Sequence, residues 1–266
     1  IAVSLYKYMD KIMIGLLSSK EQLGFYENAE KVNTIPLTII SSFGTVMLPK
    51  MSNLAAKNDK KKNLYYMRTS MKYVMCLAFA LAFGLAAVGN TFAVMFWGDS
   101  FKVSGQLIMG LSVTVPFISF ANVIRTQYLI PNQEDKKYTI SVAMGAVVNL
   151  VINFLLIPVW QSFGAMIGTI AAEITVCMLQ TISVRKELPI LQYIKDLAIY
   201  LPFGIIMFIP TYLICTHRPA TVMTFGIELI VGAAIYCILI GIYFYIVKDE
   251  LLFRYLNKIR VLVSKK

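Results

Sequence analysis

SLYKYMDKIMIGLLS, residues 4–18, places charged side chains inside a segment that is otherwise typical of a membrane-spanning helix. Its polar and small residues recur every three or four positions, which puts them on one face of a helix opposite an apolar face. A charge at the centre of a bilayer costs roughly 2.5–3.5 kcal/mol, whereas each Leu or Ile returns only about 0.3–0.6 kcal/mol. If Lys7, Asp10 and Lys11 met lipid, the free-energy cost of burying their charges would therefore exceed the gain from the apolar face. We interpret them as lining a path.

The next segment repeats this pattern. Ionisable residues at membrane depth mark substrate or ion pathways by default. The alternative for its charged residues is a place at the outer membrane interface, because they lie near one end of the predicted helix. The polar stripe consists of Glu27, Lys31, Thr34, Thr38, Ser41 and Thr45, with Glu30 beside it.

The composition excludes an ordinary soluble protein. The 266 residues are 58% hydrophobic and 15% charged, with a mean hydropathy of +0.69. Apolar blocks of about twenty residues predict an all-α, polytopic transmembrane helical bundle. The net charge of +11 falls in short loops between these blocks, which favours membrane topology over nucleic-acid binding. The chain opens at Ile1 partway through a helix, so we expect it to be the later part of a longer polypeptide.

The apolar blocks predict seven full crossings and one partial crossing. Residues 138–172 carry no charge and are too long for one crossing, so Pro158, Gln161, Ser162 and Gly164 are expected to split them into a hairpin. A basic tail, residues 248–266, is predicted to lie as a helix on the inner membrane surface. The other predicted spans are residues 1–17 (partial), 25–51, 73–97, 103–130, 193–215 and 221–247.

The distribution of Lys and Arg predicts the orientation. The loops after the second, fourth, sixth and eighth segments hold 17 of these residues, whereas the alternate loops hold only three. The positive-inside rule therefore places the basic loops and the C-terminus in the cytoplasm. The outer loops are all short, so we expect no extracytoplasmic domain.

No enzyme, cofactor or metal chemistry is predicted. The sequence has no phosphate-binding GxxxxGK[ST] loop, no dinucleotide fingerprint and no cluster of metal ligands. The single histidine, His217, lies in a predicted outer loop without a partner, and the four cysteines are interpreted as small hydrophobic residues.

The remaining intramembrane polar residues leave two interpretations open. Asn149 and Asn153 either line the path or hold helices together through hydrogen bonds. Arg125 lies close enough to the inner boundary to extend its charge there. Lys7, Asp10, Lys11 and Glu173 are the residues for which a role other than lining the path is hardest to find. The alternative for Asp10 is that it neutralises a neighbouring lysine. The predicted pathway comprises Lys7, Asp10, Lys11, Glu27, Glu30, Lys31, Arg125, Asn149, Asn153 and Glu173.

Several short motifs resemble a known family in their order and spacing. They are similar to the second half of the Wzx-type flippases of bacterial polysaccharide repeat units, which belong to the multidrug/oligosaccharidyl-lipid/polysaccharide exporter superfamily. The resemblance implies a second six-helix lobe at residues 1–184, two additional helices at 185–247 and a basic cytoplasmic tail at 248–266. The motifs are DKIMIG (10–15), GFY (24–26), Pro49, NxxxNxxxIP (149–158), GAxxGT (164–169) and AE (172–173).

The resemblance further implies a function. It is the flipping of undecaprenyl-diphosphate-linked oligosaccharides across the bacterial inner membrane by alternating access, for O-antigen, capsule or other surface polysaccharide. Lys7, Lys11 and Arg125 would contact the anionic head group, and Asp10 and Glu173 would act as charge partners or proton carriers. The implied partners are the lipid-linked oligosaccharide, membrane lipid, a polysaccharide polymerase and a chain-length regulator. The alternatives are a cation-coupled multidrug exporter of the same superfamily and a membrane glycan polymerase or ligase.

Overall fold

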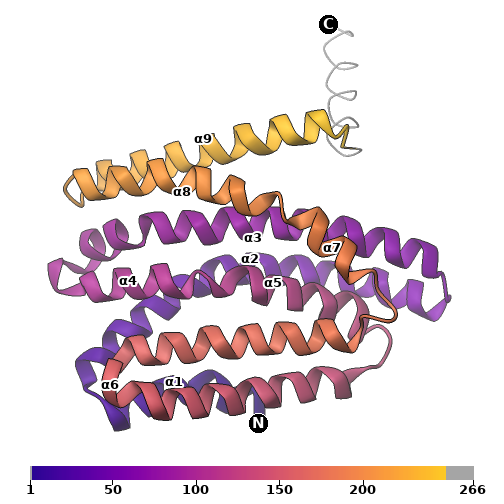
Figure 1. The fold of residues 1–266 in the computed structure, drawn as a ribbon, viewed down its shortest axis with the longest axis horizontal. Coiled ribbons are helices and arrows are strands. Elements are labelled where there is room, and N and C mark those ends of the chain that lie inside the picture. Colours follow the sequence, from indigo (N-terminus) through magenta and orange to yellow (C-terminus); the bar gives the residue numbers. More distant parts are fainter. Residues whose placement is uncertain (1, 250–266) are drawn as a thin grey trace, which may run out of the picture.

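The computed structural model describes residues 2–249 and the side chains of residues 8–249. This part of the chain is all-α and has no strand, which confirms the predicted fold class. The long helices lie side by side, and the two last ones form an outer layer (Figure 1). In chain order the elements are α1 (Ala2–Leu17), α2 (Lys20–Ala56), α3 (Lys60–Trp97), η1 (Asp99–Phe101), α4 (Lys102–Leu111), α5 (Thr114–Ile124), the π-turn η2 (Arg125–Leu129), α6 (Asp135–Ser183), α7 (Ile190–Leu197), α8 (Tyr200–His217) and α9 (Val222–Ile246).

The element α6 is a hairpin, as the sequence predicts. The backbone reverses at Gln161, which has φ 51° and ψ −127°, so residues 135–160 and 162–183 form two antiparallel arms (Figure 1). Five helical segments are long and apolar enough to cross a membrane, and the bent α4–α5 pair makes six. The two arms of α6 are counted there as one segment. Counted separately they give seven crossings, as the sequence predicts, and α1 is the partial crossing.

The predicted span 103–130 differs from the structure because it is broken. Its two halves bend by 42° between Leu111 and Thr114. Pro116 has no N–H to donate to the carbonyl of Ser112, and this missing bond frees the helix to bend there. The end of the span then widens into η2, where the Ile130 amide donates to the Arg125 carbonyl at 2.9 Å.

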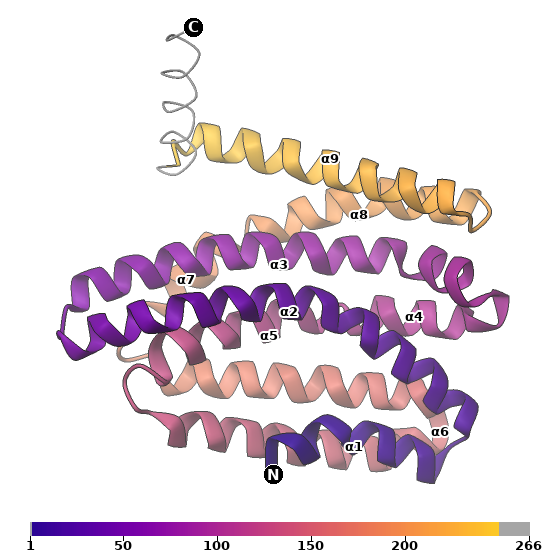
Figure 2. The ribbon, with the colours of Figure 1, turned by 180° about the vertical axis from the view of Figure 1, so that it is seen from behind.

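The basic loops all lie at one end of the bundle, which we call the basic end. It holds residues 57–59, 130–134, 184–189 and 247–249. The connections of α1 to α2, α3 to α4 and α8 to α9, and the turn of α6, lie at the opposite end (Figures 1 and 2). At the basic end Asp59 caps α3 by accepting a hydrogen bond from the Lys62 amide at 3.2 Å, and the Lys62 side chain lowers the pKa of Asp59. This arrangement matches the alternation that the charge count predicts.

Two apolar cores stabilise the bundle, one toward each end. The larger lies toward the basic end and includes Met51, Met71 and Tyr200. The smaller lies toward the opposite end and includes Ile14, Tyr26 and Ala165, so it packs α1 and α2 against both arms of α6. The second core surrounds the candidate site described below.

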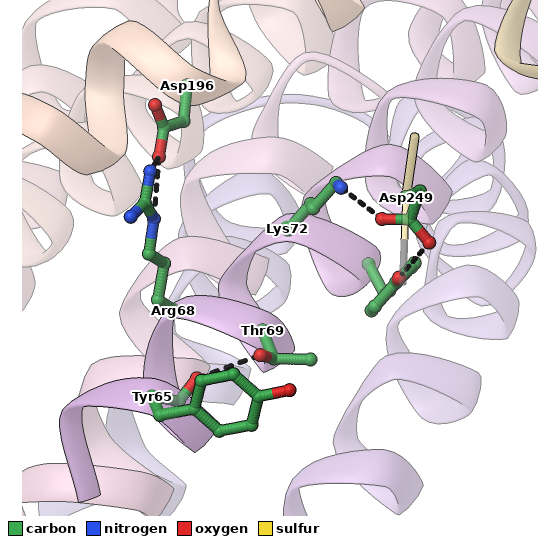
Figure 3. Close-up of polar contacts among 7 residues, drawn as sticks. Tyr65, Arg68, Thr69, Lys72, Asp196 and Asp249 are labelled. Atoms are coloured by element: carbon green, nitrogen blue, oxygen red, sulfur yellow. Dashed lines mark hydrogen bonds and ion pairs between the residues drawn. The ribbon is translucent and has the colours of Figure 1, made fainter. Parts of the chain in front are cut away.

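Charged residues on α3 hold α7 and the end of α9 (Figure 3). Arg68 donates from Nε and Nη2 to Asp196 Oδ2, at 3.0 and 2.7 Å, and one turn later Lys72 pairs with Asp249. The Asp249 side chain is only 5% exposed against 37% for Asp196, so the Lys72 pair is less screened by solvent. The predicted boundary at residues 184/185 remains a prediction, and the predicted tail beyond Asp249 lies outside the described residues.

Candidate substrate pathway

The carboxylate of Asp10 is the centre of a buried polar network. Its Oδ1 accepts hydrogen bonds from Asn149 Nδ2 at 2.8 Å and Asn153 Nδ2 at 2.5 Å. Its Oδ2 accepts from Tyr26 Oη at 3.0 Å and Thr169 Oγ1 at 2.9 Å. These donors come from α2 and from both arms of α6, and Asp10 itself is only 7% exposed. The network therefore joins four segments, with the consecutive helices α1 and α2 held to the two arms of α6 far along the chain.

The local sequence explains why the four donors converge. Asn149 and Asn153 are one helical turn apart, so their amides lie on the same face of the first arm. Gly168 on the second arm leaves room for that face, because a Cβ there would lie 2.0 Å from Asn153 Oδ1. A Cβ on Gly164 would similarly lie 2.5 Å from the Leu156 backbone. The two arms therefore approach each other closely at Gly164 and Gly168, as small residues in membrane helices allow.

Among the described side chains, hydrogen-bond donors satisfy both oxygens of Asp10. A carboxylate accepts at both oxygens, and the four donors use both of them. The alternative that Asp10 neutralises a neighbouring lysine therefore does not hold for the side chains that the structure describes. Lys7, the nearest lysine before it in sequence, has a side chain outside that range. Asn149 and Asn153 are almost completely buried and connect helices, as the hydrogen-bonding alternative expects.

Lys11 lies on the more open side of the same helix. Its Nζ pairs with Glu30 Oε2 at 2.7 Å, with the two side chains 25% and 30% exposed. On α2, Lys31 pairs with Glu27 at 3.1 Å, and both of these side chains are more exposed. The Lys11–Glu30 ion pair therefore joins α1 to α2 beside the buried network. All four charged side chains remain partly exposed at the surface of the bundle.

The rest of the α2 stripe is polar and uncovered. Thr34, Thr38 and Thr45 are exposed, and Ser41 is half-buried. Their hydroxyls donate to carbonyls of their own helix, for example Thr38 Oγ1 to the Thr34 carbonyl at 2.8 Å. This satisfies the hydroxyl hydrogens while leaving oxygen lone pairs at the surface. The stripe therefore offers a face that water or sugar can contact.

Arg125 lies apart from the Asp10 network. Arg125 lies at the start of η2, near the basic end, where its Nη1 donates to Tyr138 Oη at 3.1 Å and its guanidinium lies over the Tyr138 ring. Lys11 lies toward the opposite end, so the structure does not bring Arg125 and Lys11 together. Glu173 is half-buried, one turn after Thr169 on the second arm of α6.

Two of the hydrogen-bond donors to Asp10 were not predicted from the sequence. Tyr26 and Thr169 belong to the motifs that carry the family resemblance, but nothing in their spacing indicates that they meet Asp10. The structure buries Glu228 completely, and it accepts a hydrogen bond from Thr91 Oγ1 at 2.8 Å. Among the described residues no group of three or more His, Cys, Asp or Glu could hold a metal ion.

The family described as polysaccharide biosynthesis protein matches residues 1–106, which include Asp10, Lys11 and the whole of α2. The chain is also similar to the probable low-salt glycan biosynthesis flippase Agl15 of Haloferax volcanii. The two are 23% identical over 164 residues, which are 62% of this chain and 34% of that protein.

The fold is similar to a solved structure of the lipid II flippase MurJ in an inward closed conformation. The TM-score is 0.79 at 17% sequence identity, over 94% of this chain and 52% of that one. The chain therefore spans about half or less of the length of these proteins. These three comparisons bear out the predicted resemblance: the chain is similar in sequence to a polysaccharide biosynthesis family and to a glycan biosynthesis flippase, and it shares its fold with a lipid II flippase.

Proposed function

We propose that this chain is one lobe of a transporter that flips undecaprenyl-diphosphate-linked oligosaccharide repeat units across the bacterial inner membrane. The observation that carries the proposal is the uncovered polar face of α2, with Lys31, Thr34 and Thr38 exposed in a bundle whose surface is otherwise mostly apolar. Such a face is unfavourable against acyl chains and favourable against a hydrated cavity. A second lobe facing α2 would enclose that cavity.

The chemistry of this face suits a glycolipid head group. Lysine and arginine form charge-assisted hydrogen bonds with phosphate oxygens, and hydroxyls and carboxylates bond sugar hydroxyls. In our proposal Lys7, Lys11 and Arg125 contact the diphosphate at successive positions along the path. The Lys11–Glu30 pair lies at the edge of the polar face, so Lys11 can exchange Glu30 for a phosphate. Asp10 and Glu173 act as charge partners or proton carriers.

The Asp10 network supports alternating access. Because it ties α1 and α2 to both arms of α6, these segments are expected to move as one rigid body. Rocking of such a body against the second lobe would open the polar face to one side of the membrane at a time. We expect the flipped repeat unit to be used by a polysaccharide polymerase and a chain-length regulator, with the C-terminus of the flippase in the cytoplasm.

The test is complementation in a strain that lacks the full-length protein. Lys7→Ala with Lys11→Ala should abolish surface polysaccharide, measured by immunoblot of the polymer, while the amount of protein in the membrane stays unchanged. Lys20→Ala with Lys102→Ala is the matched control, because both lysines are exposed at the opposite end away from the stripe. Wild-type polymer in the first double variant would reject the proposed head-group contact.

A further inference from the structure

An apolar groove lies on a part of the bundle that the polar face does not use. Its volume is about 900 Å³, and its walls come from α3, the α4–α5 pair, the second arm of α6, α7 and α8. Phe79, Phe117 and Leu201 are among the side chains that line it. None of the proposed pathway residues lines it, and no residue of α1 or α2 contributes to it, so the groove is separate from the pathway proposed above.

The groove leads into a second cavity at the basic end. This cavity has a volume of about 680 Å³ and shares Thr181, Ile182 and Ile194 with the groove. Its other lining residues include Arg185 and Lys195, at the end of the α6 arm and in α7. An apolar groove is thus continuous with a mouth that carries two cations.

The two cations are available to a ligand. Arg185 and Lys195 are exposed, and neither makes an ion pair with another residue in the described range 2–249. The neighbouring acids have other partners: Glu187 pairs with Lys137 at 3.7 Å, and Asp196 pairs with Arg68 at 2.7 Å. The mouth of the groove therefore has a net positive charge.

The depth of the groove matches one leaflet of a membrane. Along α3 its lining runs from Met75 to Ala86. Eleven helical steps of about 1.5 Å span about 16 Å, which is half of a hydrocarbon core of about 30 Å. A site of this depth, open to lipid and ending in cations at the membrane boundary, has the shape and charge of a single diacyl lipid.

We propose that this groove and its mouth bind one anionic phospholipid from the leaflet at the basic end. Its phosphate lies between Arg185 and Lys195, and its acyl chains lie against Phe79, Phe117 and Leu201. Basic pockets between transmembrane helices are known to take anionic head groups at this depth. A polyprenyl chain is much longer than one leaflet, so the depth of the groove favours a diacyl lipid over the transported lipid.

The test uses the full-length protein in phosphatidylcholine nanodiscs that contain a phosphatidylglycerol with a photoreactive acyl chain. We expect labelled peptides from residues 75–86 and from α8. Arg185→Gln with Lys195→Gln should weaken binding about thirtyfold, equal to about 2 kcal/mol at about 1.4 kcal/mol per tenfold, because each cation near the surface contributes about 1 kcal/mol. Ala86→Phe narrows the groove without a change of charge and should also reduce labelling.

Lys60→Gln with Lys61→Gln is the matched control, because it removes two exposed cations at the same end but outside the groove. Labelling should stay at the wild-type level in this variant. Unchanged labelling in the Arg185/Lys195 variant, or equal labelling by a photoreactive phosphatidylcholine, would overturn the proposal. Displacement of the label by undecaprenyl phosphate but not by phosphatidylglycerol would overturn it too, by assigning the groove to a polyprenyl chain.

Discussion

At the scale of single residues, Asp10 shows how a charged side chain is accommodated in a membrane helix. Its four donors replace the water that the carboxylate would lose in the bilayer. The donors also bond one another or the backbone, since Asn153 Nδ2 donates to Asn149 Oδ1 at 3.1 Å and Thr169 Oγ1 to the Ala165 carbonyl at 3.0 Å, and a buried amide or hydroxyl without an acceptor is costly. The network is therefore expected to respond as a unit.

Asp10→Ala should lower the free energy of unfolding by about 2–5 kcal/mol, because it leaves buried donors unsatisfied. The check is unfolding of the purified protein in detergent. In a double-mutant cycle with Asn153→Ala the coupling energy should be about 1–3 kcal/mol. Asp99→Ala, at an exposed position, is the control and should change stability by less than about 0.5 kcal/mol. Additive effects of the two substitutions would contradict a shared network.

Gly168→Ala should disturb the same network from the second arm of α6. The new methyl group would lie 2.0 Å from Asn153 Oδ1, so the amide must move away from Asp10. We expect a loss of about 1–3 kcal/mol, measured as a lower midpoint of unfolding. Gly241→Ala in α9 is the matched control, because its Cβ would have nothing within 4 Å. That change should be neutral or stabilising by up to about 1 kcal/mol, and equal losses at both positions would argue against the packing explanation.

At the scale of elements, the α6 hairpin depends on a single backbone position. Gln161 has φ 51° and ψ −127°, a conformation that favours glycine and mirrors the first central position of a type II turn. The sequence indicates the reversal through Pro158 and Gly164 but does not indicate which residue adopts the unusual conformation. The sequence also does not indicate the bend between α4 and α5, because the apolar pattern continues across it.

Gln161→Gly should raise the free energy of unfolding by about 1 kcal/mol, because it relieves backbone strain at an exposed position. Gln161→Val should lower it, since a β-branched side chain is the least compatible with this φ. Thermal unfolding of both variants provides the measurement. Equal midpoints for the glycine and valine variants would show that the turn stores no such strain.

At the scale of the whole molecule, the two ends of the bundle differ in charge. The orientation predicts that the loop at residue 58 faces the cytoplasm and the loop at residue 100 faces outward. In a background without Cys76, Cys177, Cys215 and Cys237, Ser100→Cys should react with a membrane-impermeant maleimide on intact cells. Asn58→Cys should react only after the cells are permeabilised, and the reverse pattern would invert the topology.

The sequence by itself determined the class of fold, the number of crossings, the helical hairpin and the alternation of charge between the two ends. These features follow from local hydropathy, turn chemistry and the cost of burying charge, which act over short stretches of chain. Only the tertiary structure decided that Asp10 meets Tyr26, Asn149, Asn153 and Thr169, that Arg125 lies apart from Lys11, and that Glu228 is buried. Those outcomes depend on how helices up to 159 residues apart pack against one another, and periodicity within one helix carries no information about its partner.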